Sequence, residues 1–335
     1  MAVKKSTIVL IVITIIGFFT LGIFVGWSLN SAQSSGPNAS GASPSGQLTN
    51  ALINNDTSIA TINTSEYDVY QKQVQAYIDQ QKAAGNITQL SIYFRDLIQG
   101  GSLGIDQDVK FSPASLLKVP VMMELLNMAD DDPGILKKQL PYDHVFNTEQ
   151  PHYPPEQFLQ LGQTYTVDDL IYRMIVYSDN EAMTLLRANF DSDKINQIYN
   201  DLGLIVPSGE SDDNFMSVRS YASFFRILYN ASYLSQASSE KALNMLSQVK
   251  FTKGLVAGVP AGTVVAHKFG ERQTTDTGIT QLHDCGIVYY PKHPYLLCVM
   301  SRGTSYPMLE KVIADVSRMF WNEIDQRVNP SPTPK

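Results

Sequence analysis

The sequence has few cysteines, and the two that it has lie close together. Among 335 residues only Cys285 and Cys298 occur, one on each side of the turn Pro291–Pro294, and no His/Cys cluster accompanies them. Two cysteines exclude a small fold held by a disulfide framework, and the lack of nearby ligands leaves a metal site without support. We therefore expect a protein without metal or cofactor.

The state of these cysteines depends on the turn between them. If Tyr290 pairs with Tyr295 across a four-residue loop, Cys298 faces Ile287, and the cysteines become diagonal neighbours, a poor geometry for a disulfide. A two-residue turn would place them opposite each other and allow a bond. We favour the first arrangement, with two buried free thiols.

Charge is absent from one long stretch near the N-terminus. Residues Ile8 to Leu29 are mostly apolar, and Lys4 and Lys5 precede them. About 20 apolar residues suffice to cross a bilayer, and lysines on one side favour a cytoplasmic N-terminus. We expect residues 1–29 to be a single-pass membrane anchor that leaves the rest of the chain extracytoplasmic. A cleaved signal peptide, giving a secreted protein, is the rival interpretation.

Basic residues are too few to favour a polyanionic partner. After residue 29 the chain carries 23 lysines and arginines against 32 aspartates and glutamates, a formal net charge of −9. Such a surface argues against nucleic acid as the main partner.

Large apolar residues are sparse in two segments. Residues 30–64 are rich in Ser, Asn, Gly, Ala, Thr and Pro, and Asp56 is their only charge. Such a segment cannot bury enough surface to fold, so we expect a flexible extracytoplasmic linker. Residues 329–335 are interpreted as a short disordered tail.

The remaining residues, 65–328, suit one domain of generous size. Periodicity and turn residues predict a helix over 66–84, a strand over 87–97, several helices between 115 and 248, strands over 263–270, 278–290 and 295–303, and a last helix to about 325. Thr166 is expected to cap a helix that runs to about Val176. The order predicts an α+β fold, in which an antiparallel sheet from both chain ends is flanked by helices and an all-helical subdomain is inserted.

Three short motifs follow one another in this domain: Ser115-Leu-Leu-Lys118, Ser178-Asp-Asn180 and Lys268-Phe-Gly270. In a helix that begins near Ser115, the serine and the lysine of the first motif lie one turn apart on a shared face. Two further S-x-x-K strings, at Ser238 and Ser247, have no S-D-N after them, and we interpret them as surface segments.

In order, these motifs resemble the S-x-x-K, S-D-N and K-T-G signature of class A β-lactamases and penicillin-binding proteins. The resemblance covers roughly Tyr67 to Glu323. It implies a serine hydrolase that opens β-lactam or related amide bonds through an acyl-enzyme on Ser115. One alternative is a D,D-peptidase that acts on cell-wall peptides and deacylates slowly. A non-catalytic ligand-binding module is the alternative outside the enzymes.

The resemblance also implies roles for the polar side chains of the motifs. Lys118 would accept the proton of Ser115, and Lys268 would be the second cation that lowers the pKa of Lys118. Ser178 would pass the proton to the leaving nitrogen, and Asn180 would hold the substrate amide.

Two further roles fall on the last motif and the residue after it. The backbone N–H groups of Ser115 and Glu271 would form the oxyanion hole. Gly270 would keep the edge of its strand open to substrate.

The sequence departs from the family at two places. Phe269 stands where the family has a threonine or serine whose hydroxyl grips the substrate carboxylate, so Arg272 or His283 would have to supply that contact. Class A β-lactamases deacylate with a glutamate in an E-x-x-x-N pattern. Glu210 to Asn214 has that spacing, which makes Glu210 the candidate deacylating base, but the loop around it is short.

Overall fold

The computed structural model describes residues 47–50, 67–148, 150–207, 214–274 and 278–330. Within these residues no helix is both long enough and apolar enough to cross a membrane. The expected anchor at 1–29, most of the expected linker and the end of the tail lie outside the described residues.

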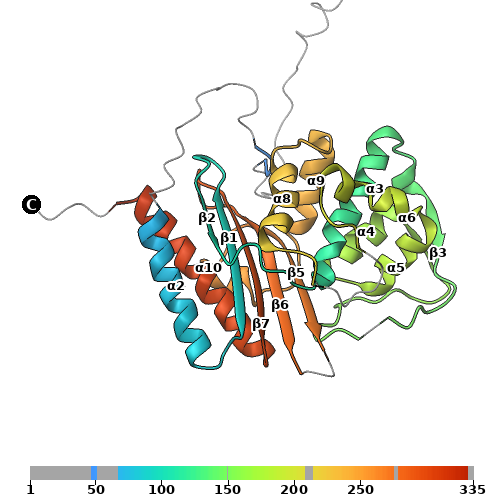
Figure 1. Cartoon of the computed structure of the whole chain (residues 1–335). Coiled ribbons are helices and arrows are strands. Elements are labelled where there is room, and N and C mark those ends of the chain that lie inside the picture. Colours follow the sequence, from blue (N-terminus) through green and yellow to red (C-terminus); the bar gives the residue numbers. More distant parts are fainter. Residues whose placement is uncertain (1–46, 51–66, 149, 208–213, 275–277, 331–335) are drawn as a thin grey trace, which may run out of the picture. The chain divides into compact units, whose positions relative to one another are not determined.

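A five-stranded antiparallel sheet forms the centre of the domain, in the order β2-β1-β7-β6-β5 (Figure 1). Its strands are β1 (Gln89–Asp96), β2 (Ser102–Ile105), β5 (Val265–Gln273), β6 (Thr280–Val288) and β7 (Tyr295–Gly303). Because β1 pairs with β7 near the other end of the chain, the predicted sheet from both chain ends is confirmed. β5 is the edge strand nearest the helical subdomain.

Two helices from opposite ends of the domain cover one face of the sheet, α2 (Asp68–Ala83) and α10 (Tyr306–Val328) (Figure 1). α2 buries Tyr70, Val74 and Ile78, which recur every four residues as one helical face requires. The predicted stop at Gly85 is present, with a φ of 74° that glycine adopts without strain.

The helical subdomain lies on the other side. It contains the 3₁₀ helix η2 (Ala114–Leu117), α3 (Lys118–Asp131), η3 (Ile135–Lys137), α4 (Val167–Val176), α5 (Asn180–Asn189), α6 (Ser192–Ile195), α7 (Gln197–Asp201), α8 (Val218–Tyr229) and α9 (Gln236–Leu246). The cap predicted at Thr166 is confirmed, because its hydroxyl accepts the N–H of Asp169 at 3.1 Å. A small sheet of β3 (Gln139–Pro141) and β4 (Thr164–Thr166), and η4 (Leu255–Gly258), were not predicted.

The prediction of free thiols is wrong, because Cys285 and Cys298 form a disulfide between β6 and β7. They are direct partners in the register, since the strands pair from Val288 and Tyr295. The tight two-residue turn is the one present: the N–H of His293 bonds the carbonyl of Tyr290, and Lys292 has a φ of 62°. The four-residue loop that we favoured shifts this register by two residues.

Four residues of the expected linker lie against the domain. The Glu240 carboxylate on α9 accepts the N–H groups of Leu48 and Thr49 at 2.9 Å, and the Tyr289 hydroxyl donates to the carbonyl of Leu48. The side chain of Thr49 is buried. Residues 47–50 are therefore held against the domain by Glu240 and Tyr289.

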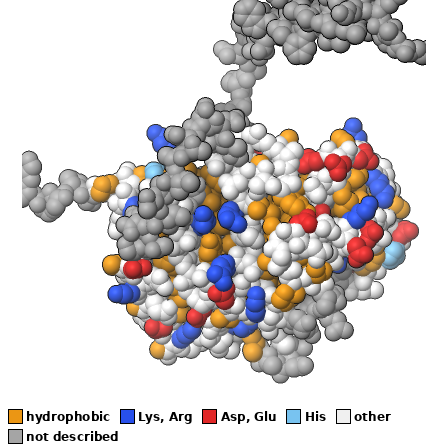
Figure 2. All heavy atoms as spheres, turned by 45° about the horizontal axis from the view of Figure 1, so that its top comes forward, with side chains coloured by type: hydrophobic (Ala, Val, Ile, Leu, Met, Phe, Trp, Pro, Cys, Tyr) orange, Lys and Arg blue, Asp and Glu red, His pale blue; other side chains and the backbone are white. Residues whose placement is uncertain are grey.

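Acidic side chains gather on the helical subdomain, at the right-hand end of Figure 2. Exposed carboxylates of the helical subdomain include Asp130, Asp131, Asp132, Asp191 and Asp193. This distribution agrees with the acidic composition of the chain.

Candidate active site

Ser115 lies at the junction of the helical subdomain and the sheet. It belongs to η2, and α3 begins at Lys118, so the predicted helix starts as a tight 3₁₀ turn. Ala114 precedes it with a φ of 48°, a left-handed conformation that costs an ordinary residue about 1–2 kcal/mol. Strain of this kind persists where the surrounding structure fixes the backbone, and here it sets the direction of the Ser115 side chain.

The Lys118 amine is buried beside the serine. Its Nζ lies 3.0 Å from Oγ of Ser115, 2.6 Å from the carbonyl of Ser178, 3.2 Å from Oγ of Ser178 and 2.7 Å from Oδ1 of Asn180. Its side chain is 1 % exposed. The first two motifs are thus in direct contact.

The S-D-N motif forms the sharp connection between α4 and α5. Ser178 has a φ of 58°, which turns its side chain toward the lysines. Asp179 caps α5 by accepting the N–H groups of Glu181 and Ala182. The middle residue of the motif therefore holds the helix, while its two neighbours face Lys118.

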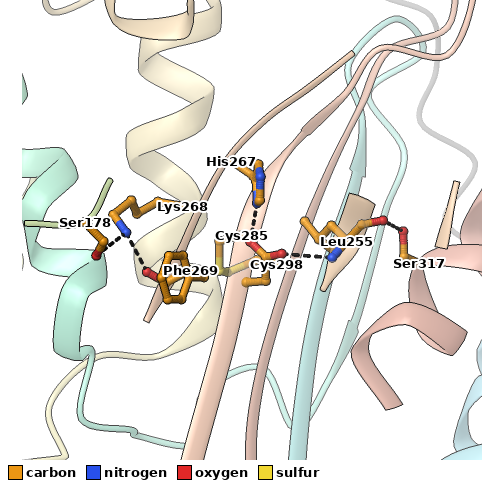
Figure 3. A network of polar contacts seen from close by, with 9 residues as sticks. Ser178, Leu255, His267, Lys268, Phe269, Cys285, Cys298 and Ser317 are labelled. Atoms are coloured by element: carbon orange, nitrogen blue, oxygen red, sulfur yellow. Dashed lines mark hydrogen bonds and ion pairs between the residues drawn. A yellow bond between two sulfur atoms is a disulfide. The ribbon is translucent and has the colours of Figure 1, made fainter. Parts of the chain in front are cut away.

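Lys268 brings the third motif to the same point from β5. Its Nζ lies 2.9 Å from Oγ of Ser178 and 3.0 Å from the carbonyl of Phe269 (Figure 3). Oγ of Ser178 consequently lies between two lysines, one from each half of the domain.

Burial weakens the basicity of both lysines. It lowers the pKa of Lys118 from 10.5 to about 7, although the Asp179 and Glu271 carboxylates act in the opposite direction. Burial also lowers the pKa of Lys268, and the charge of Lys118 lowers it further. Repulsion from the Lys118 charge thus adds to desolvation at Lys268, whereas desolvation lowers the pKa of Lys118, which is partly a free base at neutral pH.

Gly270 permits the close contact between β5 and η2. A side chain here would place its first carbon 2.7 Å from the carbonyl oxygen of Pro113 and 3.0 Å from Leu116. The space beside Gly270 is therefore filled by the turn that carries Ser115. The expectation that Gly270 keeps the edge of its strand open to substrate stays a prediction.

His283 is not in the site, contrary to the expectation. Its side chain is fully buried, with Nε2 2.9 Å from the carbonyl of Ser112 and Nδ1 3.2 Å from the N–H of Ser301. Nε2 therefore donates, Nδ1 accepts, and burial lowers the pKa of this neutral ring to about 4. His283 supports the backbone three residues before Ser115 and cannot reach a substrate.

Phe269 lies in an aromatic cluster, and its ring also faces the Lys268 amine, whose Nζ is 4.1 Å from the ring centroid. Its ring stacks on Phe251 at 4.3 Å and meets Tyr153 edge-on at 5.8 Å. The residue is 4 % exposed. The hydroxyl of the family motif is thus replaced by a buried apolar contact.

A cavity of about 690 Å³ opens beside Ser115. Its wall includes Lys118, Asn180, Glu271 and Arg272. Ser115, Lys118, Asn180 and Arg272 are thus brought together as predicted, and Ser178 and Lys268 lie directly behind them. Glu210 falls outside the described residues.

Several residues of this cavity could not be predicted from the sequence. His152 and Tyr306 line it, as does the side chain of Glu271, which we had considered only for its backbone. His152 lies in a proline-rich stretch without periodicity. No group of three or more possible metal ligands occurs within the described part of the chain.

Comparisons with known proteins agree with the motifs and the fold. A family model described as the beta-lactamase enzyme family matches residues 70–324. The chain therefore belongs to the beta-lactamase enzyme family. The comparison with curated proteins gives no match.

Solved structures share the fold. A mutant of PBP-A, in acyl-enzyme complex with penicillin G, is 26 % identical, with a TM-score of 0.65 over 76 % of this chain and 96 % of its own. A beta-lactamase from Chitinophaga pinensis is 21 % identical, with a TM-score of 0.66 over 75 % and 99 %. TLA-1, an extended-spectrum beta-lactamase, is 19 % identical, with a TM-score of 0.67 over 77 % and 98 %. The likeness spans nearly the whole length of each relative.

Proposed function

We propose that this protein is an acyl-transferring serine hydrolase whose nucleophile is Ser115. The observation that carries the proposal is the 3.0 Å contact between Oγ of Ser115 and the buried Nζ of Lys118. An amine whose pKa is about 7 has a free lone pair in half of the molecules at that pH, so it can take the serine proton.

The proton path uses the contacts of the two lysines. Oγ of Ser115 attacks the carbonyl carbon of the substrate, and its proton passes to Nζ of Lys118. Ser178, held between Lys118 and Lys268, returns a proton to the leaving group when the bond to the carbonyl breaks. While the proton is on Lys118, the positive charge of that amine is stabilised by the Asp179 and Glu271 carboxylates nearby.

Two backbone N–H groups are suited to the oxyanion. Ser115 lies in the first turn of η2, where N–H groups have no acceptor within the helix. The carbonyl of Phe269 accepts a hydrogen bond from the Lys268 amine, so it points away from β6. The backbone groups of successive strand residues point to opposite edges in turn, so those of Phe269 and Glu271 point to the same edge. The N–H of Glu271 therefore also points to the open edge, toward the cavity.

Family membership supports two classes of substrate. A β-lactam fits the family, and PBP-A was captured as a penicillin acyl-enzyme. A cell-wall peptide is the second candidate, favoured by the loss of the hydroxyl at Phe269 and by the short loop at Glu210. The two candidate functions differ in the lifetime of the acyl-enzyme, which is longer in a D,D-peptidase that deacylates slowly.

We further propose that the domain is extracytoplasmic and anchored by residues 1–29. The disulfide supports this placement, because disulfides persist in oxidising compartments. Fractionation followed by mass analysis of the mature N-terminus tests it. A chain that begins near Ser31 would replace the anchor by a signal peptide.

The acylation proposal is tested by mass spectrometry after incubation with a fluorescent penicillin and with an activated acyl thioester. An adduct on Ser115 is expected, absent in Ser115→Ala and retained in Ser238→Ala, which removes the serine of an unrelated S-x-x-K string on α9. Folded protein without an adduct from either reagent would leave the ligand-binding module as the answer. A lifetime that lengthens in Glu210→Gln favours the β-lactamase, and an unchanged lifetime removes Glu210 from deacylation.

A further inference from the structure

Glu271 brings a carboxyl group to the wall of the cavity beside the nucleophile. Glu271 follows Gly270 on the edge strand β5 and lines the same cavity as Ser115 and Lys118. The neighbouring Phe269 offers no hydroxyl, because its ring is buried against Phe251. Where the family signature would supply a hydroxyl, this chain has the buried ring of Phe269, and Glu271 stands in the cavity wall together with the cations Arg187 and Arg272.

The carboxyl is held in one position by its neighbours. Oε1 accepts the N–H of Tyr153 at 2.9 Å. Tyr153 is itself fixed, since its hydroxyl donates to Glu310 at 2.5 Å and its ring meets Phe251, Phe269 and Tyr306 edge-on. A side chain held this way loses little freedom on binding a ligand, which favours recognition.

The other carboxyl oxygen has no partner. Oε2 of Glu271 is buried and makes no hydrogen bond within the described part of the chain. A buried acceptor left unpaired costs about 1–3 kcal/mol, so a donor that reaches it contributes strongly to binding. The amines of Lys118 and Lys268 instead bond Ser115, Ser178, Asn180 and the carbonyls of Ser178 and Phe269.

The surroundings favour a donor that is bound to nitrogen. The ring of His152 stacks on Tyr306 at 4.2 Å, and both residues line the cavity with Glu271. An acidic acceptor beside aromatic faces suits an amide N–H or an ammonium group. Burial raises the pKa of Glu271, while the charges of His152 and the two lysines act to keep it ionised.

We propose that Glu271 is the specificity residue of this site and selects acyl donors whose leaving group carries an amide N–H or an ammonium rather than a carboxylate. The inference rests on the proposed acylation of Ser115. Like charges brought together in a desolvated site repel, so a carboxylate on the leaving group is rejected. A site with an unpaired acceptor also discriminates against ligands that lack the matching donor.

Three thioesters of benzoylglycine test the proposal. Their leaving thiols are mercaptoacetate, mercaptoacetamide and 2-(dimethylamino)ethanethiol, so the acyl group is constant and only the leaving group changes. The tertiary amine carries an ammonium N–H and cannot take the acyl group as a stable amide. Attack by Oγ of Ser115 forms the ester and breaks the carbon–sulfur bond, and the released thiol is followed with a chromogenic disulfide. The amide and the ammonium thioester should acylate the wild type at least tenfold faster than the carboxylate thioester, relative to their uncatalysed hydrolysis.

Two variants distinguish the effect of the Glu271 carboxylate from the effect of removing any negative charge near the site. Glu271→Gln keeps the shape and offers an N–H, so the carboxylate thioester should gain about tenfold and the ammonium thioester should lose its advantage. Glu156→Gln makes the same charge change on an exposed residue of the Tyr153 loop and should leave all three rates unchanged. A wild type that prefers the carboxylate thioester, or a Glu271→Gln variant that alters all three rates equally, would overturn the proposal.

Binding without chemistry keeps this inference distinct from the acylation proposal. The Ser115→Ala variant is titrated by calorimetry with benzoylglycylglycine and with its C-terminal amide. Tighter binding of the amide, lost in the Ser115→Ala/Glu271→Gln double variant, supports the role of Glu271 even if no thioester acylates the wild type. Equal binding, tighter binding of the acid, or no binding of either compound refutes it.

Discussion

The depressed pKa of Lys118 gives acylation a defined pH dependence. If the neutral amine is the base, the rate follows its free fraction, which for a pKa of about 7 is about 9 % at pH 6 and about 91 % at pH 8. The acylation rate should therefore rise about tenfold over these two pH units and then reach a plateau. Because Lys118 and Lys268 share Ser178, the midpoint belongs to the pair of amines.

The assay is single-turnover acylation by the mercaptoacetamide thioester, measured from pH 5.5 to 9 by stopped flow. An ordinary lysine would be about 0.3 % neutral at pH 8, and the rate would climb tenfold per pH unit without a plateau. Lys118→Met should lose about 10²- to 10⁴-fold and the pH dependence as well, because a general base contributes about that factor. A log-linear rise through pH 9 in the wild type, or an unchanged profile in Lys118→Met, refutes the assignment of the base.

The lowered pKa of Lys118 also predicts how the stability of the protein depends on pH. The folded pKa of Lys118 lies below its unfolded value, so between about pH 7 and 10.5 the unfolded chain binds more protons than the folded one. The free energy of unfolding should therefore rise by about 1.4 kcal/mol per pH unit from this group above pH 7, and Lys118→Met should lack that part of the slope. Urea unfolding of both proteins at pH 7 and 9 measures the difference.

Three further changes test other parts of the structure. Gly270→Ala forces the two halves of the site apart and should cost about 1–3 kcal/mol of stability and slow acylation, seen together in urea titration and single-turnover assays. Ala114→Gly relieves a positive φ and should raise the free energy of unfolding by about 1 kcal/mol, whereas Ala242→Gly inside α9 should lower it by a similar amount. Replacing Cys285 and Cys298 by alanine opens a cross-link between residues 13 apart and should cost about 3 kcal/mol, and an unchanged urea midpoint would contradict its role.

Local signals predicted the elements whose structure depends on local chemistry. The Thr166 cap, the stop at Gly85 and the long strands near the C-terminus were predicted because capping, left-handed turns and strand patterns involve neighbours in the sequence. The motif order also predicted that Ser115, Lys118, Ser178 and Lys268 would meet.

Features that depend on contacts between residues distant in the sequence could not be predicted from local signals. β6 is buried along its whole length, because α10 covers one face and the helical subdomain the other, so a polar residue such as His283 gave no sign of its burial. The disulfide depended on a two-residue register difference that the sequence left open. The Glu271 side chain became significant only through its distance to Tyr153, 118 residues earlier in the chain.

The position of Gly270 against the Ser115 turn also has a consequence for folding. Ser115, Lys118 and Ser178 come from the helical subdomain, and Lys268 comes from the sheet, so neither half contains the full set. A folding intermediate in which only one half is formed would lack the second amine and the strand-edge N–H. Regain of acylation during refolding should thus report the docking of the two halves, later than the recovery of helical content.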